Sequence, residues 1–369
     1  MKINLLRSIT AFSLLATTII GTSLALQNSG VEFGRRFEGQ VSDAVNDEIR
    51  ERIAKDLNGR ETTIQFFGDM MLDRHVRALI DASGKDDSCD YPFSMIDPVI
   101  GTADLRVVNM EGPLTNNDSV SVKDNGLRFT QPMKCLIDIA QRFQVVDLAN
   151  NHMYDFGSAG YAETKKNLTL AGIKYFGGYY NSPDTYYIKE INGFKIAFFG
   201  WNEAGGGGTK TVVADIKKVK EKELADFVVV MPHWGAEYKT IANDNQKKAA
   251  ADFIGAGADL IVGSHPHVIQ GAEDISGKPV FYSLGNFVFD QYFSKEVVSG
   301  LSVKLTLKRN KNGGVDSSYR LVPIAITQRS QPYETDGDEA KTVLKAISDN
   351  SPAATETFRV EIENGEFYR

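Results

Sequence analysis

Apolar runs of four to six residues recur along the middle of the chain, and between them apolar residues return every three or four positions. The first pattern predicts buried strands and the second predicts amphipathic helices. Their alternation is typical of an α/β domain. The strand-like runs are IQFF (64–67), RVVN (106–109), VVDLA (145–149), KIAFFG (195–200), FVVVM (227–231), DLIV (259–262) and PVFYSL (279–284).

Helical patterns and hairpin signals lie between and after these runs. The dipeptide Asn192-Gly193 separates two alternating segments, which predicts a hairpin with a type I′ turn and therefore a mixed sheet. Residues 301–328 read as a second hairpin that closes the domain, and one more helical stretch follows it. The helical patterns are KCLIDIAQRF, SAGYAETKKNLTLAG and NQKKAAADFIGAG, the last two with a glycine near the expected C-cap.

The N-terminal segment differs in kind from the rest of the chain. Lys2 and Arg7 precede a charge-free run from Ser8 to Val31, which predicts a signal peptide or an N-terminal membrane anchor over residues 1–30. A signal peptidase would cut after Ala25. We expect a polar spacer over 31–60, a folded domain over 61–330 and a C-terminal tail over 331–369.

Composition narrows the function classes. The chain has 369 residues, of which 42% are hydrophobic and 24% charged, as in a globular protein with a sizeable core. Its net charge is −7, and Lys and Arg are scattered, so nucleic acid is not an expected partner. Cys89 and Cys135 either form a disulfide in an oxidising compartment or remain buried thiols.

Polar clusters follow nearly every apolar run: GDMM, NMEG, NNHMYDFG, MPHWGAEY, GSHPHVIQG and GNFVFD. In α/β sheets the carboxyl ends of parallel strands share one edge, so groups far apart in sequence meet there. Four of the five histidines lie in these clusters. We therefore expect these side chains to converge: Asp69, Glu111, Asn151, His152, His233, His265 and His267.

This donor set predicts a metal centre. Carboxylate and amide oxygens together with imidazole nitrogens suit Mn, Fe, Zn or Mg. One tetrahedral ion binds four ligands, fewer than the seven candidate groups. Two divalent ions that share a carboxylate, as in binuclear hydrolytic sites, could bind most of them. Taken singly, each cluster is better explained as turn chemistry or as a hydrogen-bonded structural histidine, and only the clusters together indicate a metal site.

Other reaction signatures are lacking. GGGGTK (205–210) does not have the spacing of a phosphate-binding loop. FYSLG lacks the first glycine of a nucleophile elbow, so Ser283 is a poor nucleophile candidate. No GxGxxG opens a helix, which leaves no dinucleotide site.

Six ordered stretches over residues 64–291 resemble the CapA-type capsule and poly-γ-glutamate synthesis proteins, a branch of the calcineurin-like metallophosphatase superfamily: GDMMLDR, NMEGPLT, LANNHMYDFG, HWGAEY, GSHPHVIQG and YSLGNFVFDQ. The resemblance implies a four-layer α/β/β/α sandwich of metallophosphatase type with mixed sheets and a di-metal centre. By motif position the resemblance implies that Asp69 is the first-motif carboxylate, Glu111 the bridging acid and Asn151 the amide ligand. It further implies that His233 and His265 are the imidazoles of the second metal and that His267 is a ligand of the first.

The same resemblance implies catalytic roles. His152 matches the histidine that gives a proton to the leaving group, Asp155 is placed to orient it, and Arg74 is a candidate for gripping an anionic substrate. One position departs from the superfamily: its first motif is D-x-H, and here Met71 follows Asp69-Met70. That difference puts full occupancy by two metals in question. His75 does not match the motif and is expected at the surface or behind the ligands.

The leading expectation is therefore a metal-dependent hydrolase of the cell envelope that acts on a phosphoester or on an amide or ester of an anionic surface polymer, beside membrane-bound capsule-synthesis partners. The alternative is a non-catalytic envelope component that assembles, exports or anchors such a polymer. A plain binding module for the polymer would need a basic groove, and the composition does not indicate one.

Overall fold

The computed structural model describes residues 59–84, 88–119, 127–178, 184–206 and 208–369. The expected signal or anchor over 1–30 and all but the last two residues of the expected spacer lie outside these ranges. None of the helices in the described ranges combines the length and apolar character that a bilayer crossing requires.

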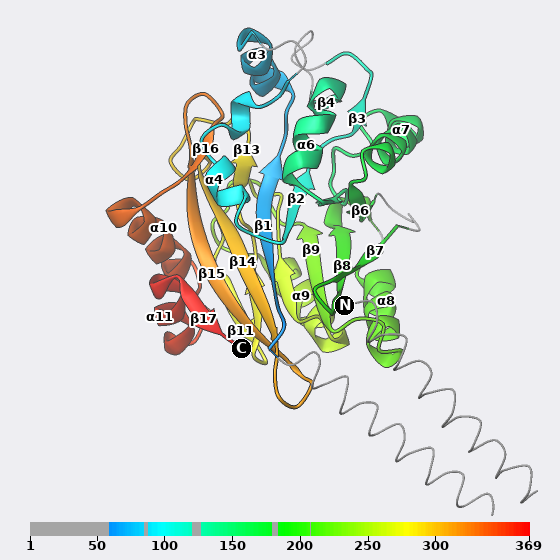
Figure 1. Ribbon diagram of the computed structural model, residues 1–369. Helices are drawn as coiled ribbons and strands as arrows, with labels where there is room; N and C mark the ends of the chain where they lie inside the picture. Colours follow the sequence, from blue (N-terminus) through cyan, green and yellow to red (C-terminus); the bar gives the residue numbers. More distant parts are fainter. Residues whose placement is uncertain (1–58, 85–87, 120–126, 179–183, 207) are drawn as a thin grey trace, which may run out of the picture. The chain divides into compact units, whose positions relative to one another are not determined.

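Two mixed β-sheets form the centre of the domain (Figure 1). In the described part of the chain, the larger sheet has the order β16-β15-β14-β1-β2-β5-β6, with β13 added beside β1 and β17 beside β15. Its strands are β1 (Glu61–Met70), β2 (Leu105–Met110), β5 (Val145–Asp147), β6 (Lys174–Phe176), β13 (Asn286–Val288), β14 (Ser299–Arg309), β15 (Val315–Ile326), β16 (Pro332–Glu334) and β17 (Glu366–Tyr368).

The smaller sheet has the order β11-β12-β10-β9-β8-β7. Its strands are β7 (Tyr186–Ile191), β8 (Phe194–Asn202), β9 (Phe227–His233), β10 (Leu260–Val262), β11 (Ala272–Ile275) and β12 (Lys278–Phe281). A short parallel pair, β3 (Leu114–Thr115) and β4 (Gln131–Pro132), lies apart from both sheets in the hydrogen-bonding pattern. All seven predicted strand runs are found as strands in one of the two large sheets.

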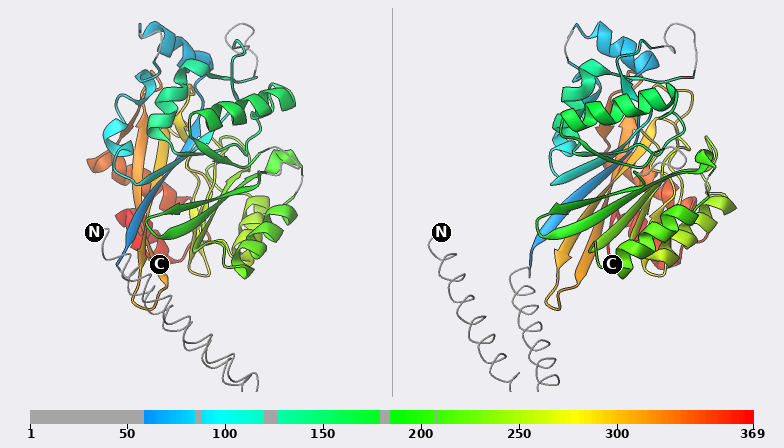
Figure 2. Two further views of the ribbon diagram at one scale, coloured as in Figure 1. Left: turned by 45° about the vertical axis from the view of Figure 1, so that its right-hand side comes forward. Right: turned by 90° about the vertical axis from the view of Figure 1, so that its right-hand side faces the viewer.

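Helices cover the outer faces of the sheets, as the views in Figure 2 show. Apolar side chains of α3 (Arg74–Ala82), α4 (Asp97–Ile100), α6 (Leu136–Arg142) and α7 (Gly157–Leu170) pack on the larger sheet. Those of α8 (Lys210–Glu221) and α9 (Asp244–Ala256) pack on the smaller sheet. The expected four-layer α/β/β/α sandwich is therefore confirmed. Short 3₁₀ turns occur at Tyr91–Phe93, Met133–Cys135 and Glu203–Gly205.

Successive side chains of a strand point to opposite faces of its sheet, and in both large sheets each face packs against an apolar core. Phe66 belongs to the core between the sheets and its neighbour Phe67 to the core under the helices. In the smaller sheet, Phe198 faces the first core and Phe199 the helices α8 and α9. Because both faces are buried, these strands read as continuous apolar runs rather than as alternating ones.

The segment 331–369 packs on the domain rather than extending from it. It contains β16, α10 (Gly337–Asp349), α11 (Glu356–Asn364) and β17, which pairs with β15. Figure 1 shows both helices beside β15. The sequence indicated one helix here, and the second was missed because Thr355 at its N-cap and Gly365 at its C-cap enclose only nine residues.

Local features predicted from sequence are also present. Asn192 and Gly193 both have positive φ, 49° and 83°, and join β7 to β8 as a hairpin. The hairpin predicted over 301–328 is β14 and β15. Cys89 and Cys135 are joined in a disulfide under the larger sheet's helices, which resolves the alternative left open by the sequence.

Candidate metal centre

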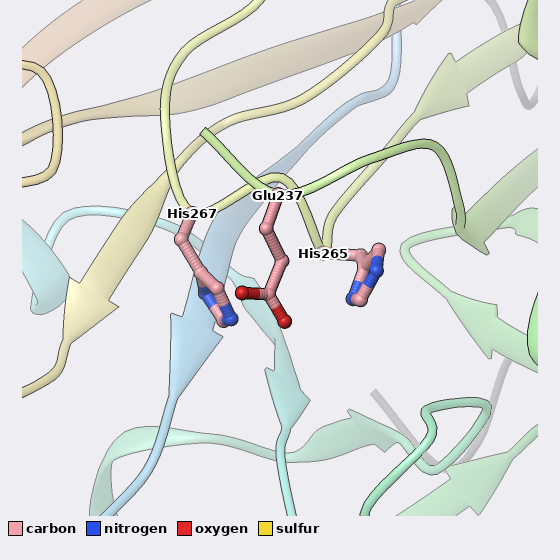
Figure 3. Close-up of side chains that lie close together, drawn as sticks. All are labelled: Glu237, His265 and His267. Atoms are coloured by element: carbon pink, nitrogen blue, oxygen red, sulfur yellow. The ribbon is translucent and has the colours of Figure 1, made fainter. Parts of the chain in front are cut away.

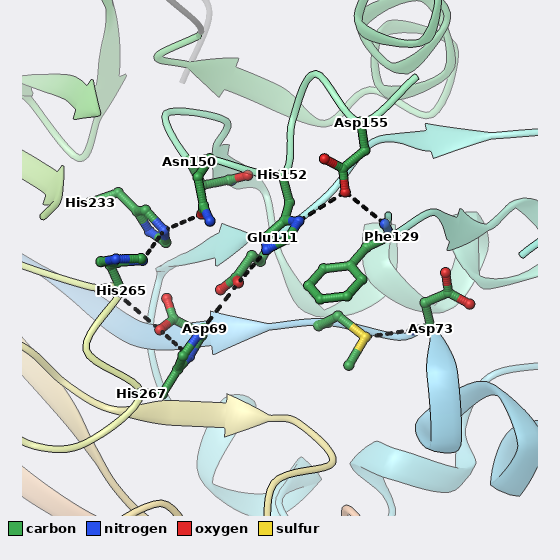
Figure 4. Close-up of polar contacts among 12 residues, drawn as sticks. Asp69, Asp73, Glu111, Phe129, Asn150, His152, Asp155, His233, His265 and His267 are labelled. Atoms are coloured by element: carbon green, nitrogen blue, oxygen red, sulfur yellow. Dashed lines mark hydrogen bonds and ion pairs between the residues drawn. The ribbon is translucent and has the colours of Figure 1, made fainter. Parts of the chain in front are cut away.

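The predicted polar side chains meet where strands of both sheets end (Figure 4). Asp69 lies at the end of β1 and Glu111 follows β2, which runs parallel to β1. In the smaller sheet His233 ends β9, and His265 follows the parallel strand β10. The expected convergence at the carboxyl edge is therefore what the structure contains.

One part of the cluster consists of Asp69, Glu111 and His267, all fully or almost fully buried. His267 Nδ1 lies 3.3 Å from Asp69 Oδ2, and His267 Nε2 lies 3.7 Å from Glu111 Oε1. Their candidate ligand atoms lie within 4.8 Å of one another. Such a group has the donor types and the spacing that a divalent cation requires.

Glu111 supplies the strongest sign that a cation fits here. Both of its carboxylate oxygens are buried, and neither has a hydrogen-bond partner among the described residues. Burial, with the charge of Asp69, raises the pKa of Glu111 to about 7, although His267 opposes the shift. The imidazole of His267, 3.7 Å away, offsets only part of the cost of burying this carboxylate, since the pKa of Glu111 stays raised and neither oxygen has a hydrogen bond; a divalent cation would offset more of that cost. The residues present therefore fit a metal ion.

The second part of the cluster contains Asn151, His233 and His265. His233 Nε2 lies 2.8 Å from Asn151 Oδ1 and 3.0 Å from His265 Nδ1. Neighbouring ligands of an ion with bonds of about 2.1 Å are separated by about 3.0–3.4 Å. The distance between His233 and His265 lies at the lower end of this range, and the distance between His233 and Asn151 is slightly shorter. Burial first, and then neighbouring histidines, lower the pKa of both His233 and His265. The imidazoles are thereby kept neutral, the form that binds metals.

The backbone of GSHPHVIQG explains why both of its rings reach the edge. His265 and His267 have φ of 95° and 57°, in the left-handed region that side chains other than glycine rarely adopt. The amide N–H of His265 donates to Asp69 Oδ2 at 3.2 Å, which ties the loop to β1. Such strain is characteristic of functional sites, where surrounding contacts maintain it.

His267 is oriented from behind. Its Nδ1 lies 3.0 Å from the amide oxygen of Asn286, whose own NH₂ donates to the backbone oxygen of Val297 at 3.0 Å. A hydrogen bond from Nδ1–H to Asn286 leaves Nε2 directed at Glu111. Although burial lowers the pKa of His267, the carboxylates of Glu111 and Asp69 outweigh it and raise the pKa to about 9.

His152 stands at the rim of the cluster and is less buried than the ligand candidates. Its Nδ1 is 2.8 Å from Asp155 Oδ2, and its Nε2 is 4.0 Å from Glu111 Oε1. The ring stacks on Phe129 with centroids 3.9 Å apart, and the Phe129 N–H donates to the same Asp155 oxygen at 2.7 Å. The ring is therefore fixed with Nε2 turned toward the predicted ligands.

Arg74 lies near this rim and is already paired. Its Nε donates to Asp290 Oδ2 at 3.0 Å and its Nη2 donates to the other oxygen. The guanidinium carbon lies 5.3 Å from the centroid of the Phe129 ring. The exposed neighbour His75 donates its backbone N–H to Asp290 and lies at the surface.

Met71, which stands at the D-x-H position, has a structural role. It is fully buried in the core of the larger sheet, and its sulfur accepts the backbone N–H of Asp73 at 3.0 Å. A thioether is a soft ligand that does not replace an imidazole in an oxygen-rich site.

Three residues of the cluster were not singled out by sequence. Asn109 donates to Asp69 Oδ1 at 2.7 Å, and Asn286 orients His267. Glu237 extends its carboxylate between the rings of His265 and His267 (Figure 3), and the three candidate ligand atoms lie within 4.8 Å of one another. All three lie in the polar clusters that follow the strands. Nothing in the sequence distinguishes them from the residues beside them in those clusters.

The fold and the cluster define a four-layer α/β/β/α protein with a candidate divalent-metal centre at its sheet edges. Residues 63–291 match the sequence model of the bacterial capsule synthesis protein family PGA_cap, and the chain belongs to that family. It is 33% identical over 321 residues to the PGA biosynthesis protein CapA of Bacillus subtilis (strain 168), covering 81% of this chain and 80% of the relative.

The chain is also similar to a second capsule biosynthesis protein and to a solved structure. The chain is 31% identical over 322 residues to the capsule biosynthesis protein CapA of Bacillus anthracis, covering 81% of this chain and 76% of that one. Among solved structures, a 5′-nucleotidase from Candida albicans is similar with a TM-score of 0.36 and 12% identity, covering 68% of this chain and 52% of the other.

Proposed function

We propose that this protein is a metal-dependent hydrolase of the cell envelope that takes part in the biosynthesis of an anionic capsule polymer of the poly-γ-glutamate class. Membership of the bacterial capsule synthesis family and the names of the Bacillus relatives support the process. The proposed reaction is hydrolysis of a phosphoester, or of an amide or ester bond of the polymer.

One observation carries the hydrolase proposal: the orphaned, buried carboxylate of Glu111 lies among Asp69, His267 and the paired His152. We propose two divalent ions, drawn from Mn, Fe, Zn and Mg. Asp69 and His267 would hold the first, Asn151, His233 and His265 the second, and Glu111 both. Divalent ions in such sites polarise the bond to be cleaved and activate water.

The protein's own part in the reaction is proton transfer. As the oxygen of water bonds to phosphorus or to the carbonyl carbon, the bond to the leaving oxygen or nitrogen breaks and that atom needs a proton. His152 would supply the proton from Nε2, and the carboxylate of Asp155 at Nδ1 would stabilise the imidazolium that holds it. Arg74 would face an anionic substrate at the rim.

The proposed location is outside the cytoplasm. The basic and then apolar N-terminus is the sequence basis for export or anchoring. The disulfide between Cys89 and Cys135 supports it, since such bonds persist in oxidising compartments. Membrane-bound capsule-synthesis proteins are the proposed partners.

A non-catalytic role in assembling, exporting or anchoring the polymer is the second candidate. Met71 favours it, because a buried methionine occupies the position of a motif histidine and one ion would then have fewer ligands. The two roles differ in turnover and not in fold.

The test compares full-length wild type with His152→Ala. Bound Mn²⁺ is measured in both, and hydrolysis is followed with bis-(p-nitrophenyl) phosphate and with poly-γ-glutamate. The hydrolase proposal expects Mn²⁺-dependent turnover that falls in the variant while bound metal is unchanged. Binding of the polymer with no turnover on either substrate would support the non-catalytic role instead.

A further inference from the structure

Glu237 is an exposed carboxylate with an unusual environment. It lies in the loop after β9 and extends between two imidazoles that come from the segment after β10 (Figure 3). The side chain of Tyr238 hydrogen-bonds to it, and that contact helps to raise the pKa of Tyr238. An ordinary surface glutamate is solvated or paired with a cation, whereas this one faces histidines.

The loop that carries Glu237 is fixed on both sides of it. Before it, the N–H of Gly235 donates to Glu203 Oε2 at 2.7 Å, and the φ of Gly235 is 87°. A Cβ at Gly235 would lie 2.6 Å from the end of the Gln246 side chain, which would have to move, and the positive φ also favours glycine there. After it, the N–H of Tyr238 donates to Pro266 O at 2.8 Å, between the two histidines. The position of Glu237 beside them is therefore built into the backbone.

We propose that Glu237 is a ligand of the first ion and takes the place left by the absent D-x-H histidine: its carboxylate approaches from the solvent side beside His267, and it also lies next to His265. The proposal rests on the proposed metal centre and goes beyond it by assigning a ligand outside the motif positions. Three acidic side chains, Asp69, Glu111 and Glu237, then face the ions.

The exchange has a consequence for the choice of metal. Replacing an imidazole by a carboxylate makes the donor set harder and more negative, and such sets favour Mn²⁺ or Mg²⁺ over Zn²⁺. The centre is thereby predicted to prefer hard ions, although three histidines remain in the cluster. If Glu237 causes this preference for Mn²⁺ or Mg²⁺ over Zn²⁺, substitution of Glu237 should change it.

The experiment measures Mn²⁺ and Zn²⁺ affinity and stoichiometry by isothermal titration of the full-length protein. Glu237→Gln keeps the shape and removes the charge, and Glu237→His supplies the imidazole. Glu221→Gln, at the exposed end of α8, is the matched control. Circular dichroism checks that each variant is folded.

We expect Glu237→Gln to weaken Mn²⁺ binding by about tenfold or more, since loss of a ligand or its support commonly costs 10–100-fold. Glu237→His is expected to shift the ratio of Mn²⁺ to Zn²⁺ affinity toward Zn²⁺ by about tenfold. Glu221→Gln should match wild type. Mn²⁺ curves of Glu237→Gln that superimpose on wild type would overturn the Glu237 assignment alone, whereas wild type that binds no divalent ion would overturn the metal centre itself.

Discussion

The rings of Phe129 and His152 stack with centroids 3.9 Å apart and planes inclined by 25°. Phe129 also donates its backbone N–H to Asp155, the residue bonded to His152 Nδ1. One residue therefore fixes both the ring and its carboxylate partner. A histidine with a purely structural role would not need Nε2 held 4.0 Å from a buried carboxylate.

The first prediction concerns His152 as the proton donor. His152→Ala should lower kcat for a phosphodiester by about 10²–10⁴-fold, the usual contribution of general acid catalysis. The loss should be smaller for a nitrophenyl than for a phenyl leaving group, because the former needs less protonation. Steady-state kinetics on the two substrates measures this. Equal losses for both leaving groups would contradict a proton-donating role.

The second prediction concerns the stabilisation that a bound ion gives. An ion that binds only the folded state stabilises it by about 2.7 kcal/mol at a hundredfold excess over Kd. Added Mn²⁺ should therefore raise the Tm of wild type, and Asp69→Asn should abolish most of the rise because a buried ligand is lost. Asp338→Asn, at an exposed position in α10, serves as the control. A full Mn²⁺ effect in Asp69→Asn would remove Asp69 from the ligand set.

The third prediction is a pH dependence of stability that arises at Asp147. This last residue of β5 is fully buried, and its Oδ2 has no partner among the described residues. Burial first, together with the charge of Asp69, raises the pKa of Asp147 well above its usual value. The folded state therefore holds the proton more tightly than the unfolded state, whose pKa is about 3.9. Stability from this group is full below that value and is lost as pH rises through the folded pKa.

Asp147→Asn keeps the acceptor for the Ala149 N–H and removes the titration. Between pH 5 and pH 8, the free energy of unfolding of wild type should therefore fall relative to that of Asp147→Asn. The fall should be about 1.4 kcal/mol for each pH unit of this range that lies below the folded pKa of Asp147. Urea unfolding at both pH values measures the fall. A difference between variant and wild type that is the same at both would refute the prediction.

The fourth prediction concerns the disulfide. Cys89 and Cys135 are 46 residues apart, and closing a loop of that length is expected to stabilise the folded state by about 4 kcal/mol in the chain-entropy model. Replacing both by serine should reduce the free energy of unfolding by an amount of that order in urea titrations. Because the bond lies under the larger sheet's helices, Mn²⁺ binding at the edge should persist. A loss below about 1 kcal/mol would show that the bond contributes little.

The sequence alone predicted the positions of those site residues that lie at the end of a strand or directly after it. Asp69, Glu111 and His233 each close or follow a strand, so parallel pairing alone brings them to one edge. His265 and His267 were predictable as a pair, but their left-handed backbone was not, because it depends on contacts with β1 and β9.

The sequence was insufficient where position depends on loops or on long-range pairing. Glu237 lies four residues beyond the end of β9 and reads as an ordinary exposed glutamate until the loop is seen folded against Pro266. The parallel pairing of β13 with β1 needs Gly68, where a Cβ would lie 1.9 Å from Gly285 O. That close approach is a property of two segments, and neither segment predicts it alone.

The central claim is that a divalent cation binds at the meeting edge of the two sheets. Crystals of the protein grown with Mn²⁺ and measured for anomalous scattering test it most directly. The account predicts an anomalous peak within about 2.0–2.6 Å of a Glu111 carboxylate oxygen, in contact with His267 or Asp69. Ordered electron density for these side chains with no anomalous peak among them, at saturating Mn²⁺, would contradict it.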